Sequence, residues 1–249
     1  MEARLQINDF ETDLLGVPVG KLVILGNDGG KGAADHLGQL VAGWSEKRIW
    51  LVSCRVPEMS PMIHALEGNG FQAVETLVTF RHALADVPTA EGVEPALPAE
   101  ADACIAIARH AFTRDRLHRD PRIPDAAADL VREHWVRNDL GGRADASLVV
   151  RAEGAVVGFN LCLLEGDEAV IDLIAVDVDH QHRGIGRRLV EGALARYRGR
   201  ARTMRVGTQA DNTASIKLYL GAGFMETDRK ITLHWINQDA APTLTGMSR

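Results

Sequence analysis

The sequence predicts an α+β fold, in which short strand-like runs alternate with amphipathic helical stretches. Residues 171–176 are rich in β-branched side chains and are followed by aspartates, which favours a buried strand. Residues 187–198 carry apolar side chains at helical spacing, so a helix is expected to begin within residues 184–186. The same alternation continues with a strand at 203–206, a helix at 213–220 and a closing strand at 231–235.

The turn at residues 181–186 has the pattern Gln-x-x-Gly-x-Gly and stands just before the expected helix. A helix start offers unpaired backbone N–H groups and the positive end of the helix dipole, and glycines let phosphate oxygens approach the backbone. Nearby arginines add fork-shaped donors. The third glycine of a dinucleotide fingerprint and the Gly-Lys-Ser/Thr of a Walker loop are missing from this stretch. The turn therefore predicts a backbone cradle for a pyrophosphate of another kind of ligand.

A second segment downstream completes a family pattern. Ile174-Ala175-Val176, Gln181-x-x-Gly184-x-Gly186, Asn212, Tyr219 and Gly221-x-Gly223-Phe224 resemble, in order and spacing, the GNAT superfamily of acyl-CoA N-acyltransferases. The resemblance extends over residues 145–236. It implies an α/β/α sandwich around a central mixed, splayed β-sheet, with acetyl-CoA as cosubstrate and no metal.

The same resemblance implies a role for each motif residue. The backbone near Ile174 or Ala175 would stabilise the oxyanion, and Ile174 and Val176 would contact the pantetheine arm. Asn212 would bind the pantetheine region; its structural role would be a helix N-cap, and both roles can hold at once. Tyr219 would protonate the leaving thiolate, with a core aromatic as its alternative. The expected cofactor-binding residues are Ile174, Ala175, Val176, Gln181, His182, Arg183, Gly184, Ile185, Gly186, Arg187, Arg188, Asn212 and Tyr219.

The general base is less well defined by the sequence. Asp172 is the first candidate, because it lies two residues before Ile174 and alternate residues of a strand share a face. A salt-bridged carboxylate at the strand end is the alternative interpretation. Further candidates for the base are Glu133, His134 and His118.

The first half of the chain carries a weaker version of the pattern. Gly68-Asn69-Gly70-Phe71 echoes residues 221–224, whereas Met59 and Leu66 stand where the functional asparagine and tyrosine would fall. A chance match of two helix ends is the alternative. We expect a smaller, degenerate acyltransferase-like domain at 1–84 with strands at 22–25, 49–52 and 74–80, a proline-containing linker at 85–100, the catalytic domain at 101–237 and a disordered tail at 238–249.

Three segments, 8–17, 111–121 and 205–214, resemble the dTDP-fucosamine N-acetyltransferase family, which acetylates the amine of a dTDP-linked amino sugar. Leu14-Leu15 and Asp115-Arg116-Leu117 depart from the usual aromatic pair and Ser-Arg-Phe of that family. Arg116 and His118 align with it and are expected to bind the acceptor, within a cationic rim completed by Arg114 and Arg119. An ordinary solvated loop is the alternative.

We therefore expect direct transfer of acetyl from acetyl-CoA to a primary amine in a ternary complex, the acceptor being a nucleotide-linked amino sugar. A different small amine, an antibiotic, a protein N-terminus or a non-catalytic acetyl-CoA sensor are the alternatives. A net charge of −6 argues against a nucleic-acid partner. Three scattered cysteines and the lack of a long apolar run indicate a cytoplasmic protein without a membrane partner, and a homodimer is left open.

Overall fold

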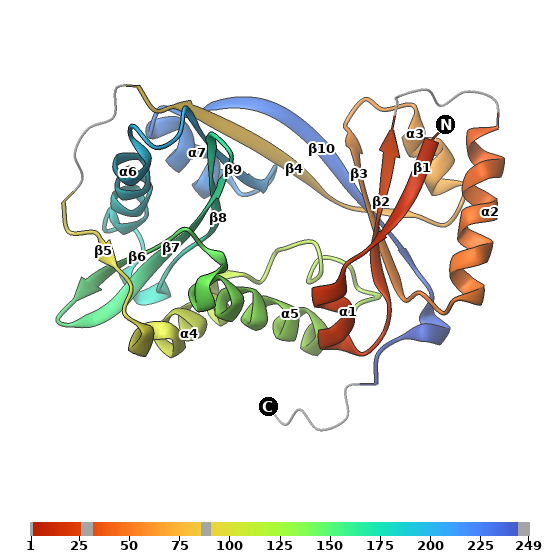
Figure 1. The fold of residues 1–249 in the computed structure, drawn as a ribbon, viewed down its shortest axis with the longest axis horizontal. Coiled ribbons are helices and arrows are strands. Elements are labelled where there is room, and N and C mark those ends of the chain that lie inside the picture. The colour runs from red at the N-terminus through yellow and green to blue at the C-terminus, as the bar shows by residue number, and fades with distance from the viewer. Residues whose placement is uncertain (1, 26–31, 86–90, 244–249) are drawn as a thin grey trace. The chain divides into compact units, whose positions relative to one another are not determined.

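The computed structural model describes residues 2–25, 32–85 and 91–243, whose elements are labelled in Figure 1. The strands are β1 (Glu2–Ile7), β2 (Val19–Leu25), β3 (Leu51–Pro57), β4 (Gln72–Ala83), β5 (Glu94–Pro95), β6 (Ala146–Ala152), β7 (Ala155–Glu165), β8 (Glu168–Val176), β9 (Thr203–Gln209) and β10 (Met225–Ile236). The helices are α1 (Asp9–Leu15), α2 (Ala33–Glu46), α3 (Met62–Glu67), α4 (Ala101–Ala111), α5 (Asp125–Asn138), α6 (Ile185–Tyr197) and α7 (Thr213–Gly221), with short helical turns η1 (Pro98–Glu100), η2 (Asp139–Arg143), η3 (Val178–His180) and η4 (Gln238–Ala240).

The elements predicted for the second half are present. The expected strands correspond to β8, β9 and β10, and the expected helices to α6 and α7. In the first half, β2 and β4 include the predicted runs, whereas β3 begins at Leu51 rather than at residue 49. The α+β class and the mixed sheet are therefore confirmed.

Two compact units divide the chain, and neither is one continuous segment. Unit 1 contains residues 1–77, 114–131 and 229–249, and unit 2 contains 78–113 and 132–228. The long strands β4 and β10 each contribute one part to each unit. The domain boundaries expected from the sequence follow chain order, and they stay a prediction.

Unit 2 has a sheet with helices on both faces, as the sandwich prediction requires. Its strands follow the order β10-β4-β9-β8-β7-β6-β5. On one face, Val190 and Leu194 of α6 pack with Ile171 and Met204. On the other face, α4 packs in a second core, which contains Ile105, Ala108, Leu161 and Leu173.

Unit 1 has a smaller sheet, in the order β1-β2-β3-β10-β4. Helices α2 and α3 share a core with this sheet, and Figure 1 shows both helices beside its strands. Leu37, Trp44 and Trp235 are buried in that core, where Trp44 makes an edge contact to Trp235 at 5.6 Å between ring centroids. The opposite face of the same sheet carries polar side chains, which are described below.

The element order of the first half recurs in the second. In both halves an antiparallel pair (β1–β2, β7–β8) is followed by a parallel pair (β2–β3, β8–β9). Each half then has a short helix and a 12-residue strand, β4 or β10. The repeat predicted from the two glycine pairs is therefore present in the topology.

The two helix ends that suggested this repeat also have the same geometry. Gly70 and Gly223 adopt left-handed φ values of 85° and 87°, which disfavour a side chain. The next residue closes each turn: Phe71 N donates to Leu66 O at 3.1 Å, and Phe224 N donates to Tyr219 O at 3.0 Å. The match at both ends argues against a chance similarity.

The predicted linker and tail are partly ordered. β5 pairs with β6, and a Cβ placed on Gly192 of α6 would lie 2.8 Å from Val93 Cγ1. In the tail, η4 is helical and its Ala240 is buried. Residues 86–90 of the linker and 244–249 of the tail lie outside the described part of the chain.

The start of α6 is positioned by close packing on β7. A Cβ on Gly158 would lie 3.0 Å from Ile185 Cγ2 and 3.1 Å from both Ala175 O and Leu189 Cδ1. Asn160, which is fully buried, donates from Nδ2 to Leu189 O at 3.1 Å. These contacts leave no room for a side chain at residue 158.

We predict that Gly158→Ala lowers the free energy of unfolding by about 1 to 3 kcal/mol, because the added methyl group overpacks the α6 contact. Denaturant unfolding would measure the change. Gly43→Ala is the control: Gly43 lies inside α2 with no atom within 4 Å of an added Cβ, so helix propensity should raise stability by about 0.5 to 1 kcal/mol. Equal effects of the two substitutions would contradict the packing argument.

Candidate active site

The turn at residues 181–186 leads directly into α6. Gly184 is the N-cap of this helix with a left-handed φ of 76°, and no side chain caps the helix start. The first helical bond runs from Arg188 N to Gly184 O at 3.0 Å, so the amides of the preceding residues in the first turn have no acceptor within the helix. A Cβ on Gly184 would meet no atom within 4 Å. The turn thus offers open space beside backbone donors, as an anion site requires.

The predicted cationic residues of this turn are exposed. Arg183, Arg187 and Arg188 all lie at the surface, and Arg187 Nε bonds Glu191 Oε1 at 2.8 Å. Other arginines of the same run have structural partners instead: Arg200 binds Asp145 through two bonds of 2.9 and 3.0 Å, and Arg202 binds Asp167. The start of α6 thus carries three exposed arginines, whereas Arg200 and Arg202 farther along the chain are held by carboxylates.

Strands β8 and β9 part beside this turn. Their parallel pairing runs from Glu168↔Thr203 to Ile171↔Val206 and goes no further, although β8 continues to Val176 and β9 to Gln209. Ile174, Ala175 and Val176 lie in the parted stretch and pair only with β7 on their other side. The splayed sheet expected from the family resemblance is confirmed, and it leaves backbone groups of β8 without a strand partner on the β9 side.

Asn212 and Tyr219 belong to α7. Asn212 is its N-cap, and its Oδ1 accepts from Ser215 N at 3.2 Å, so the structural interpretation of this residue holds. Tyr219 is 2 % exposed, and its ring centroid lies 5.9 Å from those of Phe80 and Phe224. Burial raises the pKa of the Tyr219 phenol above its ordinary value, so this group keeps its proton at neutral pH.

Asp172 sits at a β-bulge. Cys162 pairs with Ile171 and Leu161 pairs with Leu173, so Asp172 is the extra residue between them. Strict alternation is interrupted there, and both Ile171 and Ile174 pack in the core that contains α6. The bulge removes the reason for placing Asp172 on the face of Ile174, because a two-residue spacing fixes the face only in a regular strand.

An ion-pair group that sequence reasoning missed occupies the bulge. Arg143 donates to Asp172 Oδ2 at 2.7 Å and also to Asp139. Burial, with the neighbouring Asp172 carboxylate, raises the pKa of the fully buried Asp139 to about 6. The (i, i+4) spacing of Asp139 and Arg143 was the available sequence signal. The role of Asp172 as a base stays a prediction.

Two other base candidates are held by charged partners. Glu133 binds Arg109 at 2.5 Å and Arg137 at 3.1 Å, and these bonds lower the pKa of its carboxyl group. Asp115 and Asp129 contact the two ring nitrogens of His118 at 2.7 and 3.0 Å. The bond to Asp115 chiefly, opposed by burial and supported by Asp129, raises the pKa of His118 to about 9. His118 is therefore a cation at neutral pH and has no lone pair with which to accept a proton.

The predicted acceptor residues are in unit 1, and the phosphate turn, Asn212 and Tyr219 are in unit 2. Arg116 donates to Glu11 Oε1 at 2.5 Å, and Glu11 is buried. In the same segment, Arg119 Nε donates to Arg114 O at 2.7 Å. Arg116 and His118 are thus both fixed by carboxylates of unit 1.

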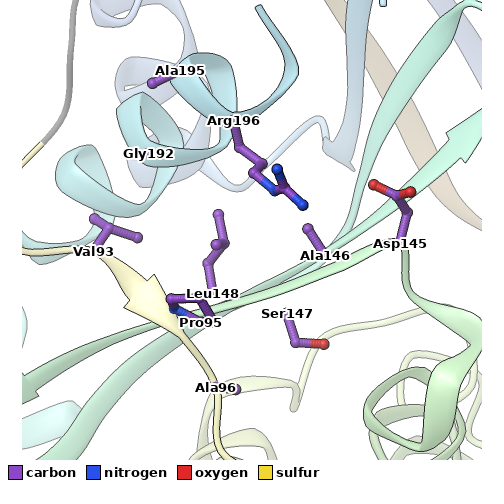
Figure 2. A pocket seen from close by; sticks show the side chains of 10 residues that line it. All are labelled: Val93, Pro95, Ala96, Asp145, Ala146, Ser147, Leu148, Gly192, Ala195 and Arg196. Carbon is purple, nitrogen blue, oxygen red and sulfur yellow. The ribbon is translucent and has the colours of Figure 1, made fainter. Parts of the chain in front are cut away.

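A surface pocket of about 600 Å³ lies elsewhere in unit 2. Figure 2 shows that β5, the start of β6 and the second half of α6 supply its lining, including Val93, Ser147 and Arg196. None of the predicted site residues lines it. The predicted site residues therefore do not form this pocket.

The described residues contain neither a candidate metal cluster nor a candidate membrane span. In that part of the chain no group of three or more His, Cys, Asp or Glu side chains is arranged to hold a metal ion. Nor does any helix among the described residues combine the length and apolar character needed to cross a membrane.

Comparison with known proteins agrees with this geometry. Residues 105–224 match the profile described as "Acetyltransferase (GNAT) family". The chain contains a GNAT acetyltransferase domain. The motifs at Ile174, Gln181–Gly186, Asn212 and Tyr219 lie inside the matched range, so the predicted GNAT domain is confirmed.

The names of two curated relatives refer to carbohydrates. The chain is 31% identical over 148 residues to the spore coat polysaccharide biosynthesis protein SpsD of Bacillus subtilis (strain 168), covering 59% of this chain and 51% of that protein. It is 29% identical over 201 residues to the dTDP-fucosamine acetyltransferase of Escherichia coli O6:H1, covering 79% and 83%. The chain thus spans about half the length of the Bacillus relative.

A solved structure extends the fold similarity over almost all of the chain. The GCN5-related N-acetyltransferase from Sphaerobacter thermophilus aligns with a TM-score of 0.67 and 18% identity, covering 97% of this chain and 77% of that one. At this identity the likeness concerns the fold. It includes the first half of the chain, where the family profile does not match.

We predict that the stabilising effect of His118 depends on pH. The folded pKa of about 9 lies above the ordinary value of 6.5, so the contribution should be complete below about pH 6.5 and lost as the pH rises through 9. The free energy of unfolding of His118→Gln should be lower than that of the wild type by on the order of 1 kcal/mol at pH 6, since the exposed Asp129 is screened by solvent.

Denaturant unfolding between pH 6 and pH 10 would measure this difference. His64→Gln, which changes an exposed histidine of the same unit, is the control. A difference that stayed constant across this pH range would show that His118 is not the stabilising cation.

Proposed function

We propose that this protein is an N-acetyltransferase that moves acetyl from acetyl-CoA to the primary amine of a nucleotide-linked amino sugar. The observation that carries the proposal is the parting of β8 from β9 beside an uncapped, glycine-containing helix start. Acetyl-CoA has a matching group for each of these features. Its thioester and pantetheine arm would bind at the parted strands, and its pyrophosphate would bind at the helix start. The GNAT domain supports the same donor, because enzymes of this family use acetyl-CoA.

Each predicted donor-binding residue has a part in this proposal. The amides at Gly184 to Arg187 and the side chains of Gln181, His182, Arg183 and Arg188 would bind the pyrophosphate. Gln181 Nε2 also contacts Val176 O at 3.4 Å, which connects the turn to the end of β8. Ile174, Ala175 and Val176 would bind the pantetheine arm through their backbone, and Asn212 would contact it from α7.

When bound, acetyl-CoA supplies an activated acyl group whose carbonyl is open to attack. The neutral amine forms the new C–N bond, and a backbone N–H near Ile174 or Ala175 stabilises the oxyanion. Tyr219 would donate its proton to sulfur as the C–S bond breaks, since its phenol is protonated at neutral pH beforehand. The amine loses its proton to a base, for which Asp172 is the candidate. Most of the acceleration comes from positioning.

Two observations support the proposed acceptor class: the names of the relatives and the cationic side chains of unit 1. The Escherichia coli relative is named for dTDP-fucosamine and the Bacillus relative for a polysaccharide. In this chain, Arg116 and His118 are cations fixed by buried or half-buried carboxylates, and they would bind the anionic part of such an acceptor. The proposed acceptor is therefore an amine that carries phosphate groups.

An acceptor screen tests this function. Purified protein, acetyl-CoA and a dTDP-linked 4-amino sugar should release free thiol and give an acceptor heavier by one acetyl group. The same amino sugar without its nucleotide, an aminoglycoside and a peptide with a free N-terminus should be poorer substrates by kcat/KM. Binding of acetyl-CoA without turnover on any amine would favour the sensor alternative, and faster transfer to the peptide would overturn the acceptor class.

Two glycine variants test the donor site in the same assay. Gly184→Val should raise the KM for acetyl-CoA about tenfold, because the side chain would fill the space beside the turn and strain its left-handed backbone. Gly166→Val is the matched control, since Gly166 also has a left-handed φ of 64° and open space, but lies in the β7–β8 turn. Equal effects on KM would count against the cradle.

We predict that Tyr219→Phe lowers kcat about 10- to 100-fold while the KM for acetyl-CoA stays within about twofold, since the change removes only the proton donor. Steady-state kinetics would measure both constants. Tyr197→Phe is the control, because Tyr197 is the other tyrosine of the chain and donates to Asp145 Oδ2 at 2.7 Å. It should lose about 1 kcal/mol of stability with little change in kcat. A wild-type kcat for Tyr219→Phe would remove the acid role.

A further inference from the structure

One face of the unit 1 sheet is polar over three adjacent strands. Lys21 of β2 pairs with Ser53 of β3, which pairs with His234 of β10, and Arg55 pairs with Thr232. Paired residues project to the same side of a sheet, as do residues two apart in a strand. The residues between them, such as Leu22, Cys54 and Leu233, are buried in the core shared with α2 and α3. This polar face is therefore the side of the sheet away from that core.

Strands β2 and β3, which both contribute to this polar face, separate from each other partway along their length. Their parallel pairing ends at Leu22↔Cys54, although β2 continues to Leu25 and β3 to Pro57. Arg55 is the first residue of β3 beyond the last pair. Unit 1 thus has a parting of parallel strands like that of β8 and β9, but here cationic side chains adjoin it.

Two arginines at this face are oriented by buried carboxylates. Arg55 donates from Nε to Thr232 Oγ1 at 2.9 Å and from Nη2 to Glu75 Oε1 at 3.3 Å, and Arg116 donates to Glu11. The carboxylate side chains are each 1 % exposed, whereas 36 % of the Arg55 side chain remains accessible. A guanidinium fixed on one edge by a buried acid can present its other edge to a ligand.

Positive charge exceeds negative charge in this group. Burial first, and then repulsion by Arg55, Lys230 and Arg116, lowers the pKa of Lys21. Burial, together with Arg116, also lowers the pKa of Arg55, even though Glu75 opposes the shift. The cations therefore repel one another despite Glu11 and Glu75. An anion bound among them would relieve this repulsion.

We propose that unit 1 binds a diphosphate group at the parting of β2 and β3, with Lys21, Arg55 and Arg116 as its donors and Lys230 adding charge. A diphosphate suits the site because its oxygens accept hydrogen bonds from the paired N–H groups of arginine. Its roughly two negative charges match the excess of cations. The site is built from unit 1 alone and is separate from the turn at 181–186. Its ligand could be the diphosphate of the acceptor or that of a separate nucleotide.

Calorimetric titration with inorganic pyrophosphate tests the site. Coenzyme A at saturation is added first, so that the proposed cradle at residues 181–186 is occupied. Arg183→Gln is titrated in parallel without coenzyme A, which separates a failure of the cradle from a failure of the unit 1 site. The wild type should bind pyrophosphate, and Lys21→Gln should bind it about tenfold more weakly, as expected for one lost charged donor. Lys47→Gln, at the end of α2 on the far side of the core, is the matched control and should bind as the wild type does.

Lys21→Gln removes one of the mutually repelling cations, so its unfolding midpoint, measured alongside, should equal or exceed that of the wild type. Wild-type affinity for pyrophosphate in Lys21→Gln and in Lys21→Glu would overturn the proposal. Steady-state kinetics then identify the source of the diphosphate. If Lys21→Gln has a higher KM for a nucleotide-linked acceptor than the wild type at constant kcat, the diphosphate belongs to the acceptor. If the variant binds a nucleoside diphosphate more weakly but its KM for the acceptor is unchanged, the ligand is a separate nucleotide.

Discussion

The parting of β8 from β9 is the constraint on which the proposed chemistry depends. Two parallel strands that separate inside a sheet leave backbone N–H and C=O groups without their usual partners, which is unfavourable unless water or a ligand binds them. The packing of Gly158 against Ile185 and Leu189 fixes the start of α6 beside this opening. Backbone donors of the strand and of the helix start are therefore held by the core rather than by mobile side chains, which is what electrostatic preorganisation requires.

The repeated topology explains why the compact units do not follow chain order. Each half ends in a 12-residue strand, and each of these strands lies beside a strand of the other half: β10 pairs with β3, and β4 is next to β9. Each sheet is thus completed by the last strand of the other repeat. Cutting the chain at the predicted linker would separate each sheet from a strand that its core requires, which is a physical reason to regard the two halves as one folding unit.

The two partings have different surroundings. In unit 2 a glycine turn with an uncapped helix adjoins the opening, and the nearby charged group of Asp172, Arg143 and Asp139 is internally paired. In unit 1 the opening adjoins Lys21 and Arg55, whose charges are only partly compensated. The repeated topology therefore places backbone groups at the opening of one copy and charged side chains at the opening of the other.

By itself, the sequence determined the features that depend on local order. Strand and helix types, the glycine turn before α6 and the αL residue at Gly223 follow from residue spacing, since neighbours along the chain decide them. Tertiary structure decided the rest. The bulge at Asp172, the partners of His118 and Arg116, the exchange of β4 and β10 and the polar face around Lys21 all depend on residues far apart in sequence. Periodicity assumes regular strands and says nothing about which carboxylate will meet which cation, so only the folded sheet could settle these pairings.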